Sequence, residues 1–374
     1  MQDFTAGGIS ATPGKTQTTG SPTTDELVKQ LVRESGCTKS GELIEEMIIT
    51  ALKLGKDQTT TADLKLFNRS LKELRHAARV FAPYRHVKKV AVFGSARTNT
   101  TAPESLAAEE FSRKMHAAHG YMTITGAGDG IMGAAQRGAG RENSFGLNIR
   151  LPFEQQANEV IHGDAKLVNF NYFFTRKLNF MKETHAVALF PGGFGTMDEG
   201  FEVLTLMQTG KARIIPVVMV DRPGATYWET WLRFLREDLL QPGLISPDDL
   251  HLFKMTHSVD EAIAEIVQFY RNYHSYRWVG QRIVFRLQKK LTTAAVEQLN
   301  TDFADILADG HIVQGAPLSE EKNEPEIAEL PRLILAPHRR NFGRFRKLID
   351  EINLAESEQD FSFQTQITSG SSPP

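Results

Sequence analysis

Short apolar segments alternate with longer amphipathic segments between residues 87 and 240. The apolar segments are VKKVAVFG, YMTITG, FGLNIRLPFE, AVALFP and RIIPVVMVD. Each has the length of a strand, and a continuous apolar run is typical of a strand whose two faces are both covered. Strands that alternate with helices of about 10–15 residues form βαβ units. We therefore predict an α/β fold built on a Rossmann-like, doubly wound parallel sheet.

This alternation divides the rest of the chain into segments. Residues 23–84 carry apolar residues at three- and four-residue spacing, which predicts an N-terminal helical segment. We assign residues 85–275 to the Rossmann-like domain and expect a helix over residues 260–277 to lead out of it. The order strand, helix, two strands and helix then predicts a small C-terminal α/β module over residues 280–355. Within this module we expect the acidic residues 319–329 to form an exposed loop.

The two ends of the chain differ from these segments in composition. Residues 1–22 and 356–374 are rich in small and polar residues, chiefly Gly, Ser, Thr and Pro. Such segments cannot bury enough apolar surface to offset the entropy lost on ordering, so we predict that both are disordered tails. The first of them has no apolar stretch of the kind found in secretory signals.

Composition and charge exclude several classes of protein. The formal net charge of −2 gives no overall field that would attract nucleic acid or a membrane surface. The single cysteine, Cys37, excludes an internal disulfide framework and fits a reducing compartment. The 11 histidines lack the spacing of metal ligands, so we predict no metal site. No apolar run reaches the roughly 18 residues that span a bilayer. We therefore expect a cytoplasmic protein without a nucleic-acid or membrane partner.

Three of the predicted strands end in glycine-rich segments, and in an open parallel sheet ligands bind beyond the carboxyl ends of the strands. Glycine lets the backbone approach an anion closely, and the start of a following helix adds a favourable dipole. A phosphate group is the ligand that such a site suits best. The residues we expect to contact it are Gly94, Ser95, Gly126, Gly128, Gly130, Gly192, Gly193, Gly195 and Thr196.

These loops match neither of the common nucleotide-binding motifs. The sequence contains no GxxxxGK[ST] motif, which argues against a P-loop NTPase. Residues 126–130 read GAGDG, which is GxGxG and not the GxGxxG of dinucleotide-binding folds. The glycines could instead serve only to make tight turns, but tight turns do not require glycine at every strand end.

Charged residues that could do chemistry lie close to the last of these loops in the sequence. Pro191–Glu199 reads PGGFGTMDE and opens a predicted helix, so Glu199 lies about one helical turn beyond the glycines. Arg176 and Lys177 lie on the preceding predicted helix. A carboxylate can stabilise positive charge that develops on a ribose, or activate water. Arg176 stays protonated, so it would bind an anion or assist a leaving group.

Together these motifs resemble the LONELY GUY family of cytokinin riboside 5′-monophosphate phosphoribohydrolases, whose signature is an Arg-Lys helix followed by PGGxGTxxE. The segments GSAR at 94–97, TGAGDGIMGAA at 125–135 and GLNIRLPFE at 146–154 also fit. The resemblance covers about residues 85–270. Members are often labelled lysine decarboxylases, but no motif of this sequence is typical of a pyridoxal-phosphate lysine site.

The resemblance implies a hydrolase that cleaves the N-glycosidic bond of a nucleoside 5′-monophosphate, giving the free base and ribose 5-phosphate. It implies that Arg176 and Glu199 are catalytic and that the 5′-phosphate is held by the glycines and threonine of residues 192–196, with Lys177 beside the substrate. It further implies a homodimer, or a higher homo-oligomer, with the substrate near the subunit interface. No metal or organic cofactor is expected.

The chain departs from short members of that family at both ends. The helical segment before residue 85 and the module after residue 275 are additions that resemble longer bacterial members and nucleotide 5′-monophosphate nucleosidases. They leave the base specificity undecided, so that the substrate could be a cytokinin precursor, AMP or several nucleotides. The alternative function is a non-catalytic nucleotide- or anion-binding protein on the same fold, which would need the glycines but not both Arg176 and Glu199.

Overall fold

The computed structural model describes residues 17–37, 40–151, 156–322 and 324–358. The chain divides between Val80 and Phe81 into a helical unit and an α/β unit. Most of the two predicted tails, residues 1–16 and 359–374, lies outside the described residues.

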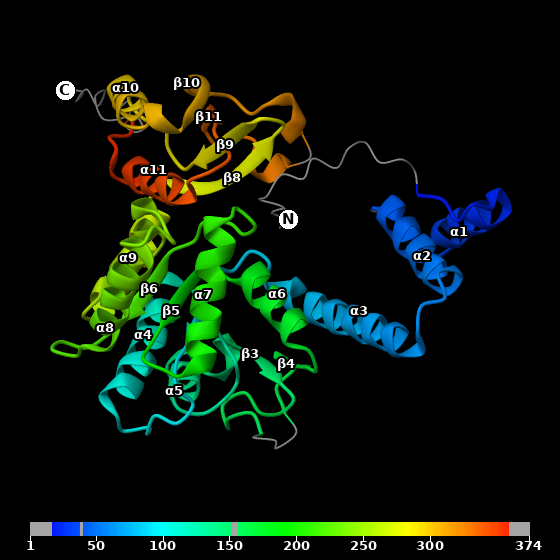
Figure 1. The fold of residues 1–374 in the computed structure, drawn as a ribbon, viewed down its shortest axis with the longest axis horizontal. Helices are drawn as coiled ribbons and strands as arrows, with labels where there is room; N and C mark the ends of the chain where they lie inside the picture. Colours follow the sequence, from blue (N-terminus) through cyan, green and yellow to red (C-terminus); the bar gives the residue numbers. More distant parts are fainter. Residues whose placement is uncertain (1–16, 38–39, 152–155, 323, 359–374) are drawn as a thin grey trace, which may run out of the picture. The chain divides into compact units, whose positions relative to one another are not determined.

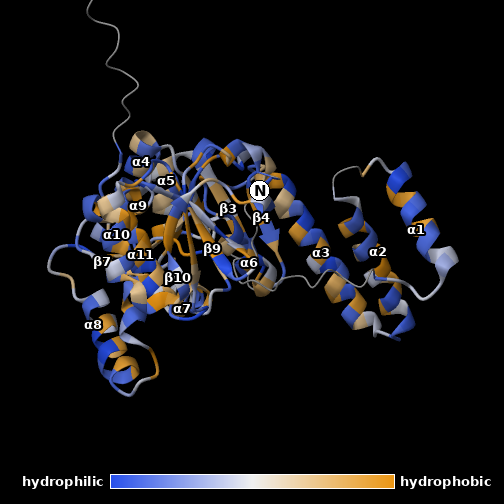
Figure 2. Ribbon diagram, turned by 90° about the horizontal axis from the view of Figure 1, so that it is seen from above, coloured by the Kyte–Doolittle hydropathy of each residue, from blue (hydrophilic) through white to orange (hydrophobic). Residues whose placement is uncertain are grey.

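The described part of the helical unit consists of three amphipathic helices, α1 (Pro22–Glu34), α2 (Gly41–Lys56) and α3, which runs from Thr61 to Phe81 at the boundary. Ser21 starts α1, because its side chain accepts a hydrogen bond from the backbone N–H of Thr24. Figure 2 shows orange and blue residues on all three helices, the mixture expected of amphipathic segments. Within the described part of the chain, no helix is both long enough and apolar enough to cross a membrane.

The α/β unit is built on a seven-stranded sheet in which every pair of neighbouring strands is parallel (Figure 1). The order across the sheet is β4-β3-β2-β1-β5-β6-β7. The strands are β1 (Lys89–Phe93), β2 (Met122–Thr125), β3 (Ser144–Ile149), β4 (Leu167–Phe170), β5 (Ala186–Leu189), β6 (Val217–Val220) and β7 (Lys254–Thr256). The chain moves outward from β1 through β2 to β4 and then returns to the other side of β1 with β5. This reversal is the topology of a doubly wound fold.

Helices cover both faces of this sheet, as the buried apolar runs require. They are α4 (Pro103–His119), α5 (Ile131–Ala139), α6 (Phe173–Glu183), α7 (Phe194–Gln208), α8 (Tyr227–Phe234) and α9 (Val259–Phe269). Val90 and Val92 of β1 pack in one core with residues of α4, α5 and α9. Alternate side chains point to the opposite face, where Phe93 contacts Phe180 of α6. The predicted Rossmann-like fold class is confirmed.

Two of the seven strands were not expected from the sequence. Strands β4 and β7 are the two edge strands and are only partly buried, so neither has the continuous apolar run of the inner strands. The predicted third strand, residues 145–154, is longer than β3, which ends at Ile149; residues 152–155 lie outside the described part. Hydrogen bonding to a neighbouring strand, which the sequence does not record, decides these boundaries.

The C-terminal part of this unit forms a second, antiparallel sheet in the order β10-β11-β9-β8. Its elements are β8 (Tyr273–Val279), β9 (Arg282–Leu287), α10 (Thr293–Asp302), β10 (Leu307–Gly315), β11 (Arg332–Pro337) and α11 (Phe342–Leu354). Side chains on one face of the sheet share a core with α10 and α11. The small C-terminal α/β module expected in the fold class is present.

The expected helix over residues 260–277 is wrong in its second half. Helix α9 ends at Phe269, and β8 begins at Tyr273. The carboxamide oxygen of Asn353 accepts hydrogen bonds from the backbone N–H groups of Asn272 and Tyr273, both at 2.8 Å. These N–H groups are therefore satisfied by α11 instead of by a continued helix, a contact that sequence periodicity could not reveal.

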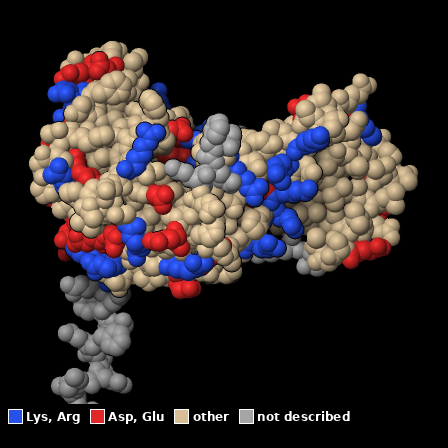
Figure 3. All heavy atoms as spheres, turned by 90° about the horizontal axis from the view of Figure 1, so that it is seen from below, with Lys and Arg blue, Asp and Glu red and all other residues tan. Residues whose placement is uncertain are grey.

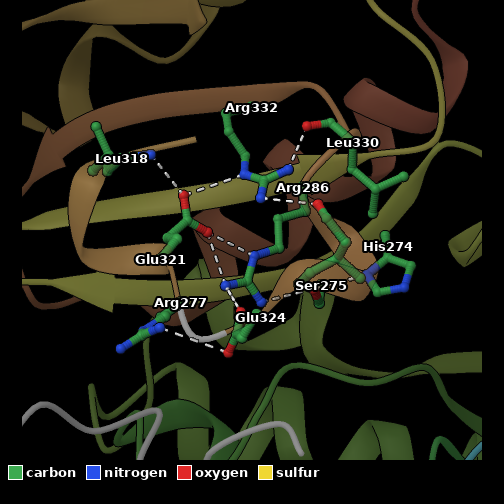
Figure 4. Close-up of polar contacts among 10 residues, drawn as sticks. His274, Ser275, Arg277, Arg286, Leu318, Glu321, Glu324, Leu330 and Arg332 are labelled. Atoms are coloured by element: carbon green, nitrogen blue, oxygen red, sulfur yellow. Dashed lines mark hydrogen bonds and ion pairs between the residues drawn. The ribbon is translucent and has the colours of Figure 1, made fainter. Parts of the chain in front are cut away.

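The acidic segment 319–329 is not the fully exposed loop that its composition predicts. Glu321 is buried, with Arg286 donating to one carboxylate oxygen at 2.8 and 3.0 Å. Arg332 and the backbone N–H of Leu318 donate to the other oxygen at 3.2 and 3.1 Å, and Glu324 also pairs with Arg286 (Figure 4). Burial opposes ionisation of Glu321, but these hydrogen bonds outweigh it and lower its pKa.

Glu321 offsets the repulsion between two arginines of the antiparallel sheet. Arg286 of β9 and Arg332 of β11 are direct cross-strand partners, and both are buried. Like charges in that position repel and destabilise a sheet. The Glu321 carboxylate bridges the two guanidinium groups and neutralises part of their charge, so the acidic segment has a structural role in the module.

On the face drawn in Figure 3, many of the basic side chains gather in one group. Acidic and basic side chains are both present on this face, and most of its area is uncharged. This mixture agrees with the net charge of −2.

We predict that Glu321→Gln destabilises the α/β unit strongly. Glutamine keeps the shape but removes the charge that faces Arg286 and Arg332, and an uncompensated buried charge costs about 3–5 kcal/mol. The free energy of unfolding in urea measures the effect. Glu320→Gln is the matched control: Glu320 is exposed, and its ion pair with Arg282 is solvated, so its loss should leave the stability nearly unchanged. Equal stabilities of the two variants would contradict the assigned role of Glu321.

Candidate active site

The three glycine-rich loops lie side by side at one edge of the parallel sheet. They follow β2, β1 and β5, and β1 is hydrogen-bonded to both of the others. The backbone N–H of Ser95 donates to the carbonyl of Pro191 at 3.1 Å, and the N–H of Ile131 donates to the carbonyl of Ser95 at 3.0 Å. Ser95 thus connects the loop after β5 with the start of α5. The structure brings together the loops that were expected to meet.

Close packing explains the glycines of the first two loops. A Cβ atom on Gly126 would lie 2.5 Å from a guanidinium nitrogen of Arg176, and one on Gly130 would lie 2.3 Å from the carbonyl oxygen of Ser95. Gly130 also has a φ of +61°, which favours glycine. Gly94 and Gly128 approach the side chains of Ile131 and Met132 in the same way. These glycines let the loops and Arg176 come together.

Gly193 and Gly195 of the third loop have open space around them instead. A Cβ atom on either residue would meet no described atom within 4 Å. Gly193 precedes the first residue of α7, and no side chain caps that helix. The first N–H groups of a helix have no partner within it, so this open helix start offers donors to an anion. Thr196 is buried at the same helix start, with its hydroxyl beside Gly192.

Arg176 and Glu199 form a buried pair next to these loops. The shortest separation, between Arg176 Nη1 and Glu199 Oε1, is 3.7 Å, and both side chains are about nine-tenths buried. Arg176 Nε donates to the carbonyl of Leu147 at 2.8 Å, and its guanidinium lies over the ring of Phe180. Within the described part of the chain, no donor hydrogen-bonds to the Glu199 carboxylate. The two side chains are thus close, but the carboxylate oxygens of Glu199 remain available to accept hydrogen bonds.

Lys177 lies among carboxylates and not at the glycines. Its ammonium group is 2.6 Å from Glu202, 3.0 Å from Asp198 and 3.7 Å from Glu199. All three partners belong to α7, so Lys177 ties α6 to α7 and places positive charge behind Glu199. The structure gives it no contact with the loops that were expected to hold phosphate.

Burial and the neighbouring charges shift the pKa values of the site residues in opposite directions. Burial raises the pKa of Glu199; Arg176 and Lys177 pull it down, but the net change is upward. Burial also lowers the pKa of Arg176, which still stays protonated. For Lys177, burial lowers the pKa, but Glu202, Glu199 and Asp198 outweigh it and raise the pKa. A carboxyl group with a raised pKa inside a cluster of charges is typical of functional sites.

Two residues that support the loops were not singled out from the sequence. The hydroxyl of Tyr227 accepts from the N–H of Gly192 at 3.2 Å and donates to its carbonyl. Asn158 donates to the carbonyl of Gly128 at 2.9 Å, and its own N–H donates to the carbonyl of Ala127 at the same distance. Tyr227 opens the helix after β6, the next strand along this edge, so its position was a usable signal. Asn158 carries no such signal.

The part of the chain that is described contains no cluster of three or more His, Cys, Asp or Glu side chains placed to hold a metal ion. What the site offers is a helix start with free donors, a buried carboxylate and an arginine that reaches it. This combination can bind an anionic group and stabilise positive charge nearby.

The sequence is similar to sequences of known proteins. Residues 132–266 match the family described as "Possible lysine decarboxylase". Over 184 residues the chain is 26% identical to cytokinin riboside 5′-monophosphate phosphoribohydrolase LOG1 of Arabidopsis thaliana, covering 49% of this chain and 84% of that protein. These matches confirm the resemblance to the LONELY GUY family.

Solved structures also align with about half of the chain. One is the structural-genomics target TM1055, with 23% identity, a TM-score of 0.36, and coverage of 49% of this chain and 99% of that chain. Another is the molybdenum cofactor carrier protein of Chlamydomonas reinhardtii, with 22% identity, a TM-score of 0.32, and coverage of 49% and 97%.

We predict that Tyr227→Phe destabilises the loop that carries the glycines. The substitution removes one hydroxyl and leaves the N–H and carbonyl of Gly192 without their partner, at a cost of about 1–3 kcal/mol. Urea unfolding measures this loss. Tyr172→Phe is the control, because the Tyr172 hydroxyl makes no hydrogen bond within the described residues. A loss of stability no larger than that of the control would show that Tyr227 does not support the loop.

Proposed function

We propose that this protein hydrolyses the N-glycosidic bond of nucleoside 5′-monophosphates. Water would add to C1′ of the ribose as the bond to the base nitrogen breaks, giving the free base and ribose 5-phosphate. Similarity to the LONELY GUY family supports a hydrolase of this type, and the activity for which LOG1 is named suggests the reaction. The proposal covers cytokinin riboside 5′-monophosphate, AMP or both.

The observation that carries the proposal is the open helix start of α7 beside a buried carboxylate. Gly193 and Gly195 are not needed for packing among the described residues, because a Cβ on either would meet nothing. They do leave room for a phosphate to approach the N–H groups of α7. Glu199 follows Gly195 by about one helical turn, so a ribose joined to that phosphate would lie within its reach.

Each charged residue then has a role that fits its surroundings. As the base departs, positive charge builds on the ribose, and the Glu199 carboxylate stabilises it or activates the attacking water. Its lack of hydrogen-bond donors among the described residues leaves its charge free for this task. Arg176 stays positive and would bind substrate anion or assist the departing base. Lys177 is a positioning residue that orients Glu199 through α7.

A lysine decarboxylase activity, which the family description suggests, fits this site less well. A lysine that forms a Schiff base must be available as a neutral amine. Lys177 has ion pairs with Glu202 and Asp198 at 2.6 and 3.0 Å, which favour its charged form. A non-catalytic nucleotide-binding protein is the remaining alternative, and free adenine released from AMP would distinguish the two.

We also propose a cytoplasmic homodimer or higher homo-oligomer. Aromatic side chains are exposed on the two helices that flank the site: Phe173 and Phe174 of α6 are 51% and 53% exposed, and Phe194 of α7 is 96% exposed. Exposed apolar residues gathered near a site favour an interface between subunits. The mass in solution by light scattering should be at least twice that of the chain; a monomer at micromolar concentration would contradict this.

We predict that Glu199→Gln abolishes most turnover of AMP. Glutamine keeps the size of the side chain but loses the charge that matters when the ribose becomes cationic, a loss of about 100- to 1000-fold in kcat. AMP affinity by calorimetry should change little, because the ground state lacks that positive charge. Glu202→Gln on the same helix is the control and should lose less, since Glu202 faces Lys177.

The pH dependence gives a second readout of the same assignment. The reaction needs Glu199 in its ionised form. Because its pKa is raised, Glu199 becomes protonated at a higher pH than an ordinary glutamate does. The wild-type rate should therefore fall as pH drops through that pKa, and Glu199→Gln should lack this limb. If Glu199→Gln retains more than about a tenth of the normal kcat, the catalytic carboxylate is another one of α7.

A further inference from the structure

A hollow of about 630 Å³ opens at the edge of the parallel sheet opposite the glycine loops. It is lined by residues that precede β1 and β2 and by the end of α9. Because parallel strands run in one direction, residues that precede β1 and β2 lie at the amino edge, whereas the candidate active site lies at the carboxyl edge. The lining includes His86, Lys88, His119, Tyr121, Tyr270 and Arg271.

The charges of this hollow are all of one kind. Lys88 and Arg271 supply two cations, and His86 and His119 add two imidazoles that can donate hydrogen bonds. None of the lining residues is acidic. Within the part of the chain that is described, none of these four side chains has a hydrogen bond or an ion pair with another residue. By contrast, the buried arginines Arg286, Arg332 and Arg346 are all paired with carboxylates.

The walls of the hollow are firmly held. The ammonium of Lys88 lies 4.1 Å from the ring centroid of Tyr270 and 5.9 Å from that of Tyr121. The Tyr270 hydroxyl donates to the carbonyl of His185 at 2.7 Å, which fixes the ring under Lys88. Gln268 donates to the carbonyl of Asn353 at 3.3 Å and so ties the α9 wall to α11 of the C-terminal module.

We propose that this hollow binds a phosphorylated small molecule, at a site separate from the candidate active site. Its volume lies within the range of small-ligand pockets, about 300–1000 Å³. Two cations and two imidazoles, which converge from three chain segments without acidic partners, match a multiply charged phosphate group. The tyrosine rings and Val267 supply apolar surface for the rest of the ligand. The module gains a role here, since α11 holds one wall in place.

Calorimetry on the full chain tests the proposal with two probes, pyrophosphate and ADP. The double variant Lys88→Met/Arg271→Met should weaken binding about tenfold or more, because each charge-assisted hydrogen bond to phosphate contributes that much. Lys88→Arg keeps the charge and should bind within about threefold of wild type. Tighter binding of ADP than of pyrophosphate identifies a nucleotide, and equal binding identifies a ligand recognised by its phosphates alone.

Two further variants test whether the probes bind in this hollow or elsewhere on the protein. Arg176→Ala removes a cation from the candidate active site and should leave binding at the hollow unchanged. Arg236→Met removes an exposed arginine elsewhere in the α/β unit and controls for general electrostatic attraction. Circular dichroism verifies folding, and the single variants Lys88→Met and Arg271→Met replace the double variant if it fails to fold.

Three outcomes would overturn the proposal. The first is the absence of binding of either probe to wild type at millimolar concentration. The second is unchanged affinity in the folded double variant. The third is a loss of affinity in Arg176→Ala or Arg236→Met as large as that in the double variant. Such a loss would show that the probe binds at the carboxyl edge or without a defined site.

Discussion

The candidate active site depends on the parallel pairing of β1 with β2 on one side and β5 on the other. Those hydrogen bonds place three strand ends at one edge, although the loops that follow them begin at residues 94, 126 and 191. The chain can return to the far side of β1 only by reversing its direction of winding, and this reversal opens the space between the loops. The contact of Ser95 with Pro191 follows directly from that pairing.

Two buried glutamates show how the protein separates structure from chemistry. Glu321 receives hydrogen bonds from Arg286, Arg332 and Leu318, and its pKa is lowered. Glu199 has charged neighbours at 3.7 Å but no hydrogen-bond donor within the described residues, and its pKa is raised. A fully bonded carboxylate stabilises a fold, whereas a buried carboxylate with a raised pKa is typical of functional sites. The comparison supports the different roles given to these residues.

Much of the central fold could be predicted, because buried parallel strands and amphipathic helices leave strong periodic patterns. The motif PGGFGTMDE and the preceding Arg176 also predicted which loops and charged side chains come together at the carboxyl edge of the sheet. The failures occurred where a distant contact overrides the local pattern. Helix α9 stops at Phe269 because Asn353 takes the next N–H groups, and the acidic segment folds inward because two arginines face each other across the sheet.

The sequence by itself determined the alternation of strands and helices, the glycines at the strand ends and the presence of Arg176, Lys177 and Glu199 near one another along the chain. Only the tertiary structure decided that Lys177 faces the carboxylates of α7, that Tyr227 and Asn158 hold the loops, and that a cationic hollow forms at the opposite edge. The reason is physical: periodicity and backbone preference are local properties, whereas ion pairs, loop support and cavities join residues that lie tens of positions apart.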